Sequence, residues 1–561
     1  MRKLGAIVSI ISIFATGTSY AQHNSSIPVD SWIYDAVQEL QTRGFLLDLS
    51  PGFKPYRRLE VAQALENLEK RVDISSLPQA DQWLIRKLDA EFSHETNLVN
   101  EEKENPDTSF TGGRFSEEAF FNLAKGDYKT FKYADKVEFR PTLRSEMGVD
   151  VGNHLLLYVD ATIDQTLRDD TLYTGTTKFG LKALHQQAYV QYSDRYVDLT
   201  FGRDYLSWGY GNNGTLLVST TAGALDMVSA LVKTNTMKFN WFVAQLNQMP
   251  EFTPDSNNYF PFGSNPTVGQ PDPLVNRYFT GSRIEFDIAN KVFLGAYQAA
   301  VFGGPYASVN LLNTNPVRLN YETSTNDTLT GRSTNNFIGG DICVFWPQDL
   351  NFYSDLMIDD WMIDHKTRGD LKPNLYAIDA GIKASNMLLG FGLPGTDVNL
   401  QYMMARNRVY NQYNWESYQK LLLRNYPIAD PFGDDFWNID LRLSQWLTFD
   451  WKLEMELMHL EHGSSNIYSF YTMPWLTDTT ITNAMVQAGY RYREPFPYGI
   501  IQETNMYRAS VMYQPRQNFY GQATISYSEN RNYEYVPGLN KGVFSFLFTI
   551  YWNFSATVPF E

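Results

Sequence analysis

The chain has 561 residues, 46 of them basic and 62 acidic, which gives a formal net charge of −16. An aromatic content of 15% is too high for a disordered chain, and the acidic balance excludes the basic footprint of a nucleic-acid partner. The single cysteine, Cys343, excludes an internal disulfide framework and a cysteine-based zinc site.

Residues 1–21 have the pattern of a cleaved secretory signal peptide. Two basic residues follow the initial methionine, residues 7–14 are apolar, and Ser19-Tyr20-Ala21 is a small-x-small cleavage site. The apolar run is too short to cross a bilayer as a helix, and no apolar run of spanning length follows it. The sequence therefore predicts an exported protein that lacks a transmembrane helix.

Residues 22–109 are predicted to form a small helical periplasmic head with a polar linker at 99–109. Apolar side chains recur at helical spacing in residues 32–45, 59–68 and 78–93. Trp32 to Phe45, Phe53-Lys54-Pro55 and Arg58 to Ala62 follow a W…A…L…G, F-x-P and R-x-E-x-A pattern that resembles an S-layer homology module. The resemblance implies peptidoglycan as a partner of the head.

From residue 110 onward the apolar period changes from 3.6 to 2. Residues 197–201 alternate apolar and polar side chains, as do residues 451–457 and 544–554. In a soluble sandwich the apolar face would form a core, whereas in an outer-membrane barrel it would face lipid. Alternation alone fits both architectures.

The lengths of the connections favour the barrel. Short turns such as Gly152-Asn153 and Ala289-Asn290 alternate with long loops, as in outer-membrane barrels. We therefore predict an all-β fold over residues 110–561, a transmembrane outer-membrane antiparallel β-barrel of about 18 strands. The alternation of short and long connections breaks down between residues 460 and 503, so a count of 20 strands is kept as an alternative. The last strand ends either at Phe554, with an extra tail, or at Phe560.

With both termini periplasmic, the long loops are predicted to lie on the cell surface. These loops are residues 204–224, 247–278, 303–335 and 409–435. The tyrosine, tryptophan and phenylalanine side chains of the wall would then contact outer-membrane lipid.

Residues 209–214 match G-x-G-x-x-G literally, but a strand-like run follows them where a dinucleotide site needs a helix. A tight surface loop that needs positive backbone angles explains these glycines better.

The remaining polar motifs predict neither a metal site nor catalysis. His459 and His462 lie at the end of a strand, without the helical H-E-x-x-H spacing of a zinc site. The carboxylate pairs Asp359-Asp360 and Asp434-Asp435 are interpreted as acidic loop tips that repel one another or bind calcium. No G-x-S-x-G elbow is present. We therefore predict no enzyme activity, no cofactor and no metal.

The 409–435 segment is rich in aromatic residues beside asparagine and aspartate. Aromatic rings stack on the apolar faces of sugars while amides and carboxylates bond the hydroxyl groups, so the segment suits a polysaccharide. An aromatic girdle at the lipid interface is the equally weighted alternative. The candidate sugar-stacking residues are Tyr410, Tyr413, Trp415 and Tyr418.

The run from Phe201 to Gly211, followed by Gly214 to Ser219, resembles the capsule assembly protein Wzi family, with its G-R-x-x-x-x-W-G-x-G and G-x-L-[LI]-x-S pattern. Thr221 and Gly223 depart from that pattern. The resemblance implies an outer-membrane lectin-like barrel that helps attach capsular or extracellular polysaccharide. By position, the candidate binding residues of this run are Arg203, Trp208, Tyr210, Asn212 and Asn213.

Two functions are therefore weighed. The leading hypothesis is capture and assembly of polysaccharide at the cell surface. The alternative is a peptidoglycan-tethered porin that passes small solutes through an open lumen, and the sequence leaves open whether the lumen is plugged.

Overall fold

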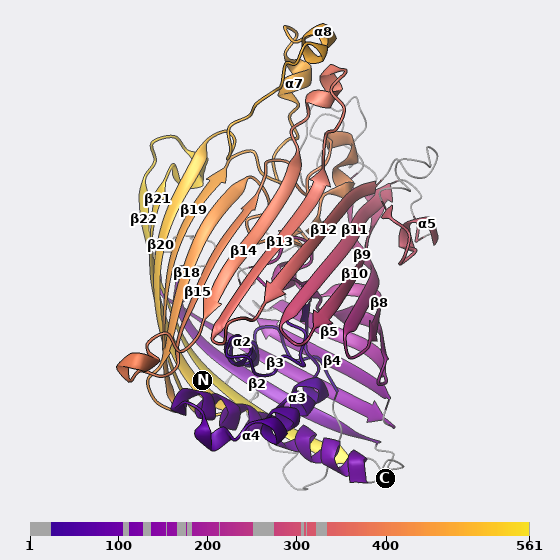
Figure 1. Cartoon of the computed structure of the whole chain (residues 1–561). Coiled ribbons are helices and arrows are strands. Elements are labelled where there is room, and N and C mark those ends of the chain that lie inside the picture. Colours follow the sequence, from indigo (N-terminus) through magenta and orange to yellow (C-terminus); the bar gives the residue numbers. More distant parts are fainter. Residues whose placement is uncertain are drawn as a thin grey trace.

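The computed structural model describes residues 24–104, 111–126, 136–152, 154–164, 176, 182–212, 214–250, 274–304, 308–309, 311–320 and 334–559. Within these residues, eighteen antiparallel strands close into one barrel (Figure 1), which confirms the predicted fold class. The barrel strands are β2 Thr111–Lys125, β3 Glu138–Val151, β4 Leu155–Asp164, β5 Lys182–Ser193, β6 Val197–Asp204, β8 Leu225–Lys233, β9 Met237–Pro250, β10 Leu274–Ile288, β11 Val292–Gly304, β12 Thr334–Val344, β13 Leu350–Asp360, β14 Leu375–Ala384, β15 Thr396–Ala405, β18 Phe436–Trp446, β19 Trp451–Gly463, β20 Ile501–Arg516, β21 Phe519–Arg531 and β22 Lys541–Pro559.

Closure joins the two ends of the strand series. β2 pairs with β22 as well as with β3, so that no edge strand is left in the barrel. Of the two predicted ends of the last strand, Phe554 with an extra tail is wrong, because β22 continues and Pro559 pairs with Gly112, while Phe560 lies outside the described residues. The broken parity between residues 460 and 503 also has a structural cause: residues 464–500 form a long loop with two short helices, α7 Pro474–Thr477 and α8 Asn483–Gln487.

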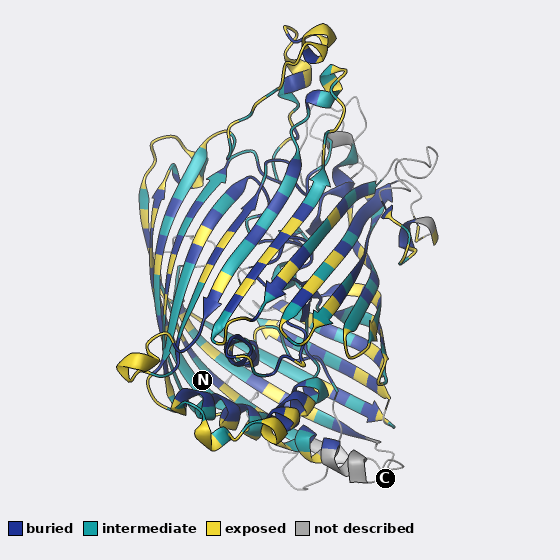
Figure 2. Cartoon of the chain, viewed as in Figure 1, coloured by how far each residue is buried: buried dark blue, intermediate teal, exposed yellow. Residues whose placement is uncertain are grey.

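The wall has an apolar outer face and a polar inner face, and Figure 2 shows the alternation along the strands. On β6, Leu199 and Phe201 point outward and are 48% and 69% exposed. Asp198, Thr200 and Asp204 point inward and are buried. This polarity is the reverse of a soluble sandwich and places the wall in lipid. No helix among the described residues is long and apolar enough to cross a membrane.

The N-terminal helices lie together at one end of the barrel, here called the head end (Figure 1). They are α2 Ile33–Thr42, α3 Arg58–Arg71 and α4 Gln79–Glu104. The third helix is longer than predicted and includes the first part of the expected linker. The head buries its own apolar core, which Trp446 of β18 joins. We call the described residues 24–104 the head.

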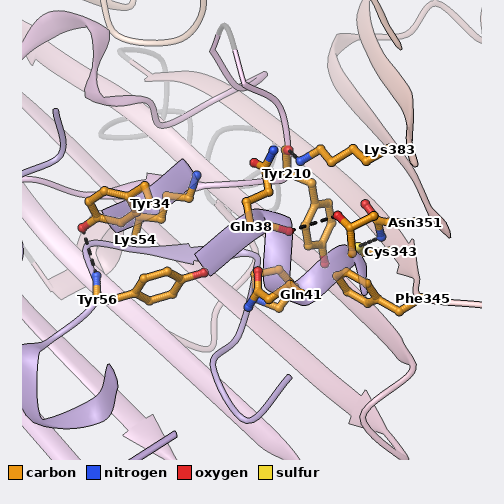
Figure 3. Close-up of a pocket in the computed structure, with 12 residues that line it drawn as sticks. Tyr34, Gln38, Gln41, Lys54, Tyr56, Tyr210, Cys343, Phe345, Asn351 and Lys383 are labelled. Atoms are coloured by element: carbon orange, nitrogen blue, oxygen red, sulfur yellow. Dashed lines mark hydrogen bonds between the residues drawn. The ribbon is translucent and has the colours of Figure 1, made fainter. Parts of the chain in front are cut away.

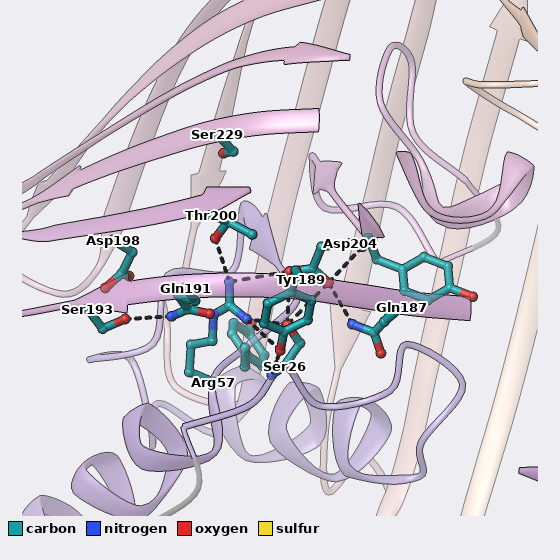
Figure 4. A network of polar contacts seen from close by, with 12 residues as sticks. Ser26, Arg57, Gln187, Tyr189, Gln191, Ser193, Asp198, Thr200, Asp204 and Ser229 are labelled. Atoms are coloured by element: carbon teal, nitrogen blue, oxygen red, sulfur yellow. Dashed lines mark hydrogen bonds and ion pairs between the residues drawn. The ribbon is translucent and has the colours of Figure 1, made fainter. Parts of the chain in front are cut away.

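The head is bound to the barrel by polar contacts with inward-facing side chains (Figure 4). The Ser26 amide donates to the Tyr189 hydroxyl at 3.0 Å, and the Ser26 hydroxyl donates to Asp204 at 3.1 Å. Arg57 pairs with the same Asp204 carboxylate at 3.4 Å and donates to Thr200. These polar groups become buried when the head docks, and hydrogen bonds compensate for their loss of contact with water.

A second set of ion pairs fixes the opposite side of the head. Arg43 is fully buried and pairs with Asp81 of the head at 2.7 Å and with Asp397 of β15 at 2.9 Å. Lys452 of β19 pairs with Glu39 at 2.9 Å. The head is therefore tied to strands on both sides of the lumen.

Candidate functional site

The loop between β6 and β8, residues 205–224, folds into the lumen, and we call it the plug loop. Its strand β7 Ser207–Trp208 pairs with β1 Phe53–Lys54 of the head. The Trp208 indole is 2% exposed and donates to Asn240 of β9 at 3.1 Å. The prediction that this loop lies on the cell surface is wrong, because its apolar residues find burial inside the barrel against the head.

Tyr210 lies at the junction of plug loop, head and wall (Figure 3). Its carbonyl accepts a hydrogen bond from Lys383 of β14 at 2.9 Å, and its hydroxyl donates to Glu285 of β10 at 3.3 Å. A cavity of about 20 Å³ remains beside it, room for one water molecule. Asn212 is partly exposed, and its backbone N–H donates to the side-chain oxygen of Gln401 on β15 at 3.4 Å.

A wider cavity, of about 690 Å³, lies at the head end between the head and the turns of β8–β9 and β10–β11. Its lining is polar and carries both signs of charge, including Asp48, Arg71, Lys238 and Asp287. Glu285 also lines it, and the same carboxylate accepts the hydrogen bond from Tyr210 of the plug loop.

The glycines of the plug loop are required by close packing in the lumen, which corrects their interpretation as a surface loop. Gly209 has φ +122°, a region that favours glycine. A Cβ on Gly211 would lie 2.4 Å from the Gly214 carbonyl oxygen and 2.6 Å from Asp379. The motif therefore allows the backbone to approach the wall closely.

We expect Gly211→Ala to destabilise the plugged barrel by about 1–3 kcal/mol, because neither backbone nor β14 wall can move away freely. The measurement is the temperature at which the detergent-solubilised protein loses its compact mobility on a gel. Gly390→Ala is the matched control, since a Cβ there meets nothing within 4 Å. Equal midpoints for the two variants would contradict the packing argument.

The segment between β15 and β18, residues 406–435, also turns inward, and we call it the cap segment. Tyr410 is 1% exposed, and its hydroxyl donates to the Leu216 carbonyl of the plug loop at 2.5 Å. The Ser219 amide donates to the Ile428 carbonyl at 3.0 Å. The predicted surface position of residues 409–435 is therefore wrong for these parts, which pack on the plug loop.

A buried arginine of the wall holds the cap segment in place. Arg277 of β10 is 0% exposed, and its guanidinium donates to three backbone carbonyls of the cap segment, those of Tyr418, Lys420 and Leu422. Because the guanidinium has five donors in a rigid fork, one side chain can fix three backbone carbonyls of the cap segment.

The carboxylate pair Asp434-Asp435 is fully buried, so its interpretation as an acidic loop tip is wrong. Asp434 accepts the Arg408 amide and Asp435 accepts the Tyr498 amide, each at 2.9 Å. Burial raises the pKa of Asp434 to about 8 and that of Asp435 to about 9, and it raises the pKa of Asp430 to about 8. These carboxyl groups hold backbone amides of the loops.

The other polar motifs also have structural partners. Asp359 accepts the Tyr410 amide at 2.8 Å, and Asp360 pairs with Lys372 at 2.6 Å, so this pair is no acidic loop tip either. His459 bonds Asn505, and His462 bonds the Asp434 carbonyl near the barrel rim. In the part of the chain that the structure describes, no group of three or more histidine, cysteine or acidic side chains is arranged to hold a metal ion.

A folded projection rises from the rim opposite the head (Figure 1). It comprises residues 361–374 and 464–500, and we call it the turret. Its small apolar core consists of Leu371, Tyr471, Trp475, Ile481 and Val486. Tyr413 of the cap segment packs against this core, with its ring centroid 4.9 Å from that of Tyr471.

The turret presents apolar and aromatic side chains to its surroundings. Trp361 and Phe470 are each 50% exposed, and Tyr490 is 36% exposed. Arg491 and Arg493 are exposed in the same loop. Sequence reasoning missed this surface because it looked for a strand between residues 460 and 503, where the structure has a loop with two short helices.

The predicted binding residues do not form one cluster. Trp208, Tyr210, Tyr410 and Tyr418 are buried in the plug loop and cap segment. Arg203 points to the outer face of the wall and pairs with Asp226 at 2.5 Å.

Of the others, Asn212 and Tyr413 are partly exposed. Asn213 and the side chain of Trp415 lie outside what the structure describes.

Comparisons with known proteins agree with this architecture. The model of the family "Capsule assembly protein Wzi" matches residues 132–543. Among solved structures, the chain is similar to Wzi of Escherichia coli, described as an outer membrane protein involved in group 1 capsule assembly and a carbohydrate-binding β-barrel. That likeness has a TM-score of 0.55 and 14% identity, over 95% of this chain and 99% of that one.

Weaker likenesses involve outer membrane proteins of Pseudomonas aeruginosa. OprD has a TM-score of 0.40 and 8% identity, over 80% of this chain and 94% of that one. OpdK has a TM-score of 0.41 and 7% identity, over 79% and 99% of the two chains. No curated protein sequence matches the chain significantly.

Proposed function

Because the chain belongs to the Wzi family of capsule assembly proteins, we propose that it holds capsular or extracellular polysaccharide at the cell surface. It lies in the outer membrane as a β-barrel and acts there as a lectin-like binding protein. The carbohydrate binding described for the Escherichia coli Wzi structure supports this role, and that structure shares the fold over nearly the whole chain.

The observation that carries the proposal is the filling of the lumen. The plug loop bonds β9, β10, β14 and β15 through its own backbone and side chains. The head contacts strands elsewhere in the wall, for example β6 through Arg57 and β19 through Glu39. A barrel filled in this way suits the binding of a polymer at its outer rim better than the passage of solutes.

The turret is the proposed contact surface for the polysaccharide. Exposed rings such as Tyr490 and Trp361 offer flat faces for sugar stacking, and Arg491 and Arg493 offer hydrogen-bond donors. Among the residues predicted from the sequence, Tyr413 is the one that packs under this surface.

The remaining predicted residues have different proposed parts. Trp208, Tyr210, Tyr410 and Tyr418 support the surface from inside the lumen, while Asn212, Asn213 and Trp415 stay candidates for direct contact.

This function implies an orientation. The turret faces the cell exterior, and the head faces the periplasm within a domain of residues 22–109 that includes the linker and follows a removed signal peptide at 1–21. Residues 110–561 then form the membrane domain. We propose binding without catalysis, since the predicted carboxylate pairs each hold backbone amides or a lysine.

The alternative of a peptidoglycan-tethered porin has less support. Two of the head residues that resemble an S-layer homology module are engaged with the rest of the chain: Phe53 pairs with Trp208 of the plug loop, and the Glu60 carboxylate lies 3.7 Å from the Lys233 ammonium of β8. A head that grips peptidoglycan through these residues would have to release the barrel.

Deleting the gene is the direct test of the function. We expect the mutant cells to make polysaccharide in normal amounts but to release most of it into the medium, because the binding surface is lost. The measurement compares cell-attached with released polysaccharide after centrifugation. Plasmid-borne wild-type protein should restore attachment, and normal attachment in the deletion strain would contradict the proposal.

A turret variant refines the test. The combination Tyr490→Ala and Arg491→Ala should restore less attachment than the wild type at equal protein level. Leu539→Ala, an exposed apolar residue in the β21–β22 loop outside the turret, is the matched control and should restore attachment fully.

A further inference from the structure

Part of the loop between β11 and β12 lies against the outer face of the barrel, beside β9 to β11 (Figure 1). We call residues 311–320, which include the short helix α5 Leu311–Thr314, the strap. The Trp241 indole of β9 donates to the Thr314 carbonyl at 2.9 Å. The Gln298 amide of β11 donates to the Arg318 carbonyl at 2.8 Å. The strap is therefore bound to the wall at two separate points.

These wall residues lie well below the rim opposite the head. Trp241, Ser282 and Gln298 are directly paired neighbours on three strands, and all three point outward. Ser282 lies six residues from Ile288, the head-end terminus of β10. At ~3.3 Å per residue and a tilt of ~40°, this is ~15 Å above the head-end rim, inside an apolar band ~25 Å tall.

The strap satisfies polar groups of the wall at this height. The Gln298 side chain donates to the Ser282 hydroxyl at 3.2 Å, and its carbonyl oxygen accepts the Asn320 amide at 2.9 Å. Without the strap, the Gln298 side-chain amide and the Trp241 indole would face hydrocarbon with fewer partners, which is unfavourable for each unsatisfied polar group.

The polarity of the strap is inverted relative to a loop in water. Its buried side chains include Asn313, Thr314 and Asn320, at 6–8% exposed. Three of the exposed side chains are apolar, Leu311 at 88%, Val317 at 81% and Leu319 at 57%, while Asn315 is exposed beside them and Arg318 is partly exposed. In water the polar residues would face outward, so this arrangement matches a surface surrounded by lipid.

The lipid-facing wall continues on both sides of the strap. Phe286 of β10 is 46% exposed, Leu294 of β11 is 38% exposed and Ile338 of β12 is 47% exposed, all on the outer face. The apolar side chains of the strap thus add to an existing apolar outer surface.

We propose that the strap is immersed in the outer leaflet of the outer membrane, where lipid acyl chains cover Leu311, Val317 and Leu319. This inference rests on the outer-membrane location and on the orientation given by the proposed function, but it does not depend on polysaccharide binding. The proposal assigns a membrane-contact surface to part of the loop between β11 and β12. The alternation of strands and loops in the sequence predicts that this loop lies outside the bilayer.

Site-directed labelling in vesicles tests the immersion. Val317→Cys carries an environment-sensitive fluorophore, and the protein is reconstituted in phosphatidylcholine vesicles with or without lipids that carry a doxyl quencher on the acyl chain. The native cysteine, Cys343, is 1% exposed, so a maleimide should label the introduced thiol alone. Leu294→Cys on the wall is the lipid-facing control, and Thr479→Cys on the turret is the water-facing control.

We expect the label at 317 to be quenched by doxyl lipid as strongly as the label at 294. Dissolved iodide should quench it about tenfold less than the label at 479, because the bilayer core excludes water and ions. Leu319→Cys repeats the measurement should the first variant fold poorly.

Two results would overturn the proposal. Strong iodide quenching at 317 together with weak doxyl quenching would place the strap in water. Protection from both quenchers would mean that protein, such as a second copy of the chain, covers the strap. Because polysaccharide is absent from this assay, failure of the proposed function leaves its outcome unchanged.

Discussion

Replacing Arg283 by methionine is expected to destabilise the plugged barrel by about 3–5 kcal/mol, because the change leaves buried carboxylates without their cation. Arg283 of β10 is 0% exposed. It forms ion pairs with Asp341 of β12 and, at 2.9 Å, with Glu285 of its own strand. Methionine keeps much of the side-chain volume, so the loss reports charge more than packing.

The same residue joins three parts of the molecule. The guanidinium lies 5.1 Å from the ring centroid of Phe53 in the head and 6.0 Å from that of Tyr210 in the plug loop. The variant should therefore loosen the head and the plug loop together. In planar bilayers we expect the wild type to give no stable ion current and Arg283→Met to give intermittent openings.

Two variants separate charge from general damage. Asp341→Asn added to Arg283→Met should recover part of the lost thermal stability, since it removes one of the uncompensated charges. Arg531→Met removes a pair with Glu503 in which the arginine is 71% exposed, and it should leave stability almost unchanged. A stable, conducting wild-type barrel would contradict the account of a filled lumen.

The barrel wall could be predicted because its signal is local. Alternation along β6, with Leu199 and Phe201 outward and Asp198 and Thr200 inward, is visible in a run of a few residues. The inward folding of loops has no such signal. The positions of Tyr410 and Trp208 depend on bonds to Leu216 and Asn240, which are remote in sequence and which no local pattern indicates.

The candidate site shows the same limit. An aromatic residue in a loop has equal local reasons to stack on sugar, on lipid or on the interior of the barrel, and only the tertiary contacts distinguish these environments. Asp434 shows the same limit for a charged residue. A pair of adjacent acidic residues predicts a solvated loop tip, but this carboxyl group is buried, where it accepts a hydrogen bond from the Arg408 backbone amide.

Replacing Arg408 by alanine is expected to release the turret from the barrel. The guanidinium forms a two-point ion pair with Glu494, with nitrogen-to-oxygen distances of 2.7 and 2.8 Å, and it donates to the Thr472 carbonyl at 2.8 Å. The aromatic rings of Trp475 and Tyr498 lie within 6 Å of it. Both charged side chains are at most 2% exposed, so removing one partner should cost about 3–5 kcal/mol of turret stability.

The measurement is limited proteolysis on intact cells, followed through cleavage within residues 464–500. We expect Arg408→Ala to be cut much faster than the wild type, while the barrel itself keeps its heat-dependent gel mobility. Glu494→Gln should give a smaller effect, because the amide can still accept a hydrogen bond from the guanidinium. Lys366→Ala is the matched control within the turret, since Lys366 is 72% exposed and pairs with Asp364, which is 69% exposed.

The attachment of polysaccharide should follow the same order as the proteolysis if the turret is the binding surface. Arg408 lies beneath that surface and does not reach the exposed rings of Tyr490 or Trp361, so its loss would act through the position of the turret. Cells with Arg408→Ala that shed no more polysaccharide than wild-type cells, despite rapid cleavage of the turret, would move the binding site elsewhere on the rim. Parallel loss of turret order and of attached polysaccharide would place recognition on the surface that Arg408 holds.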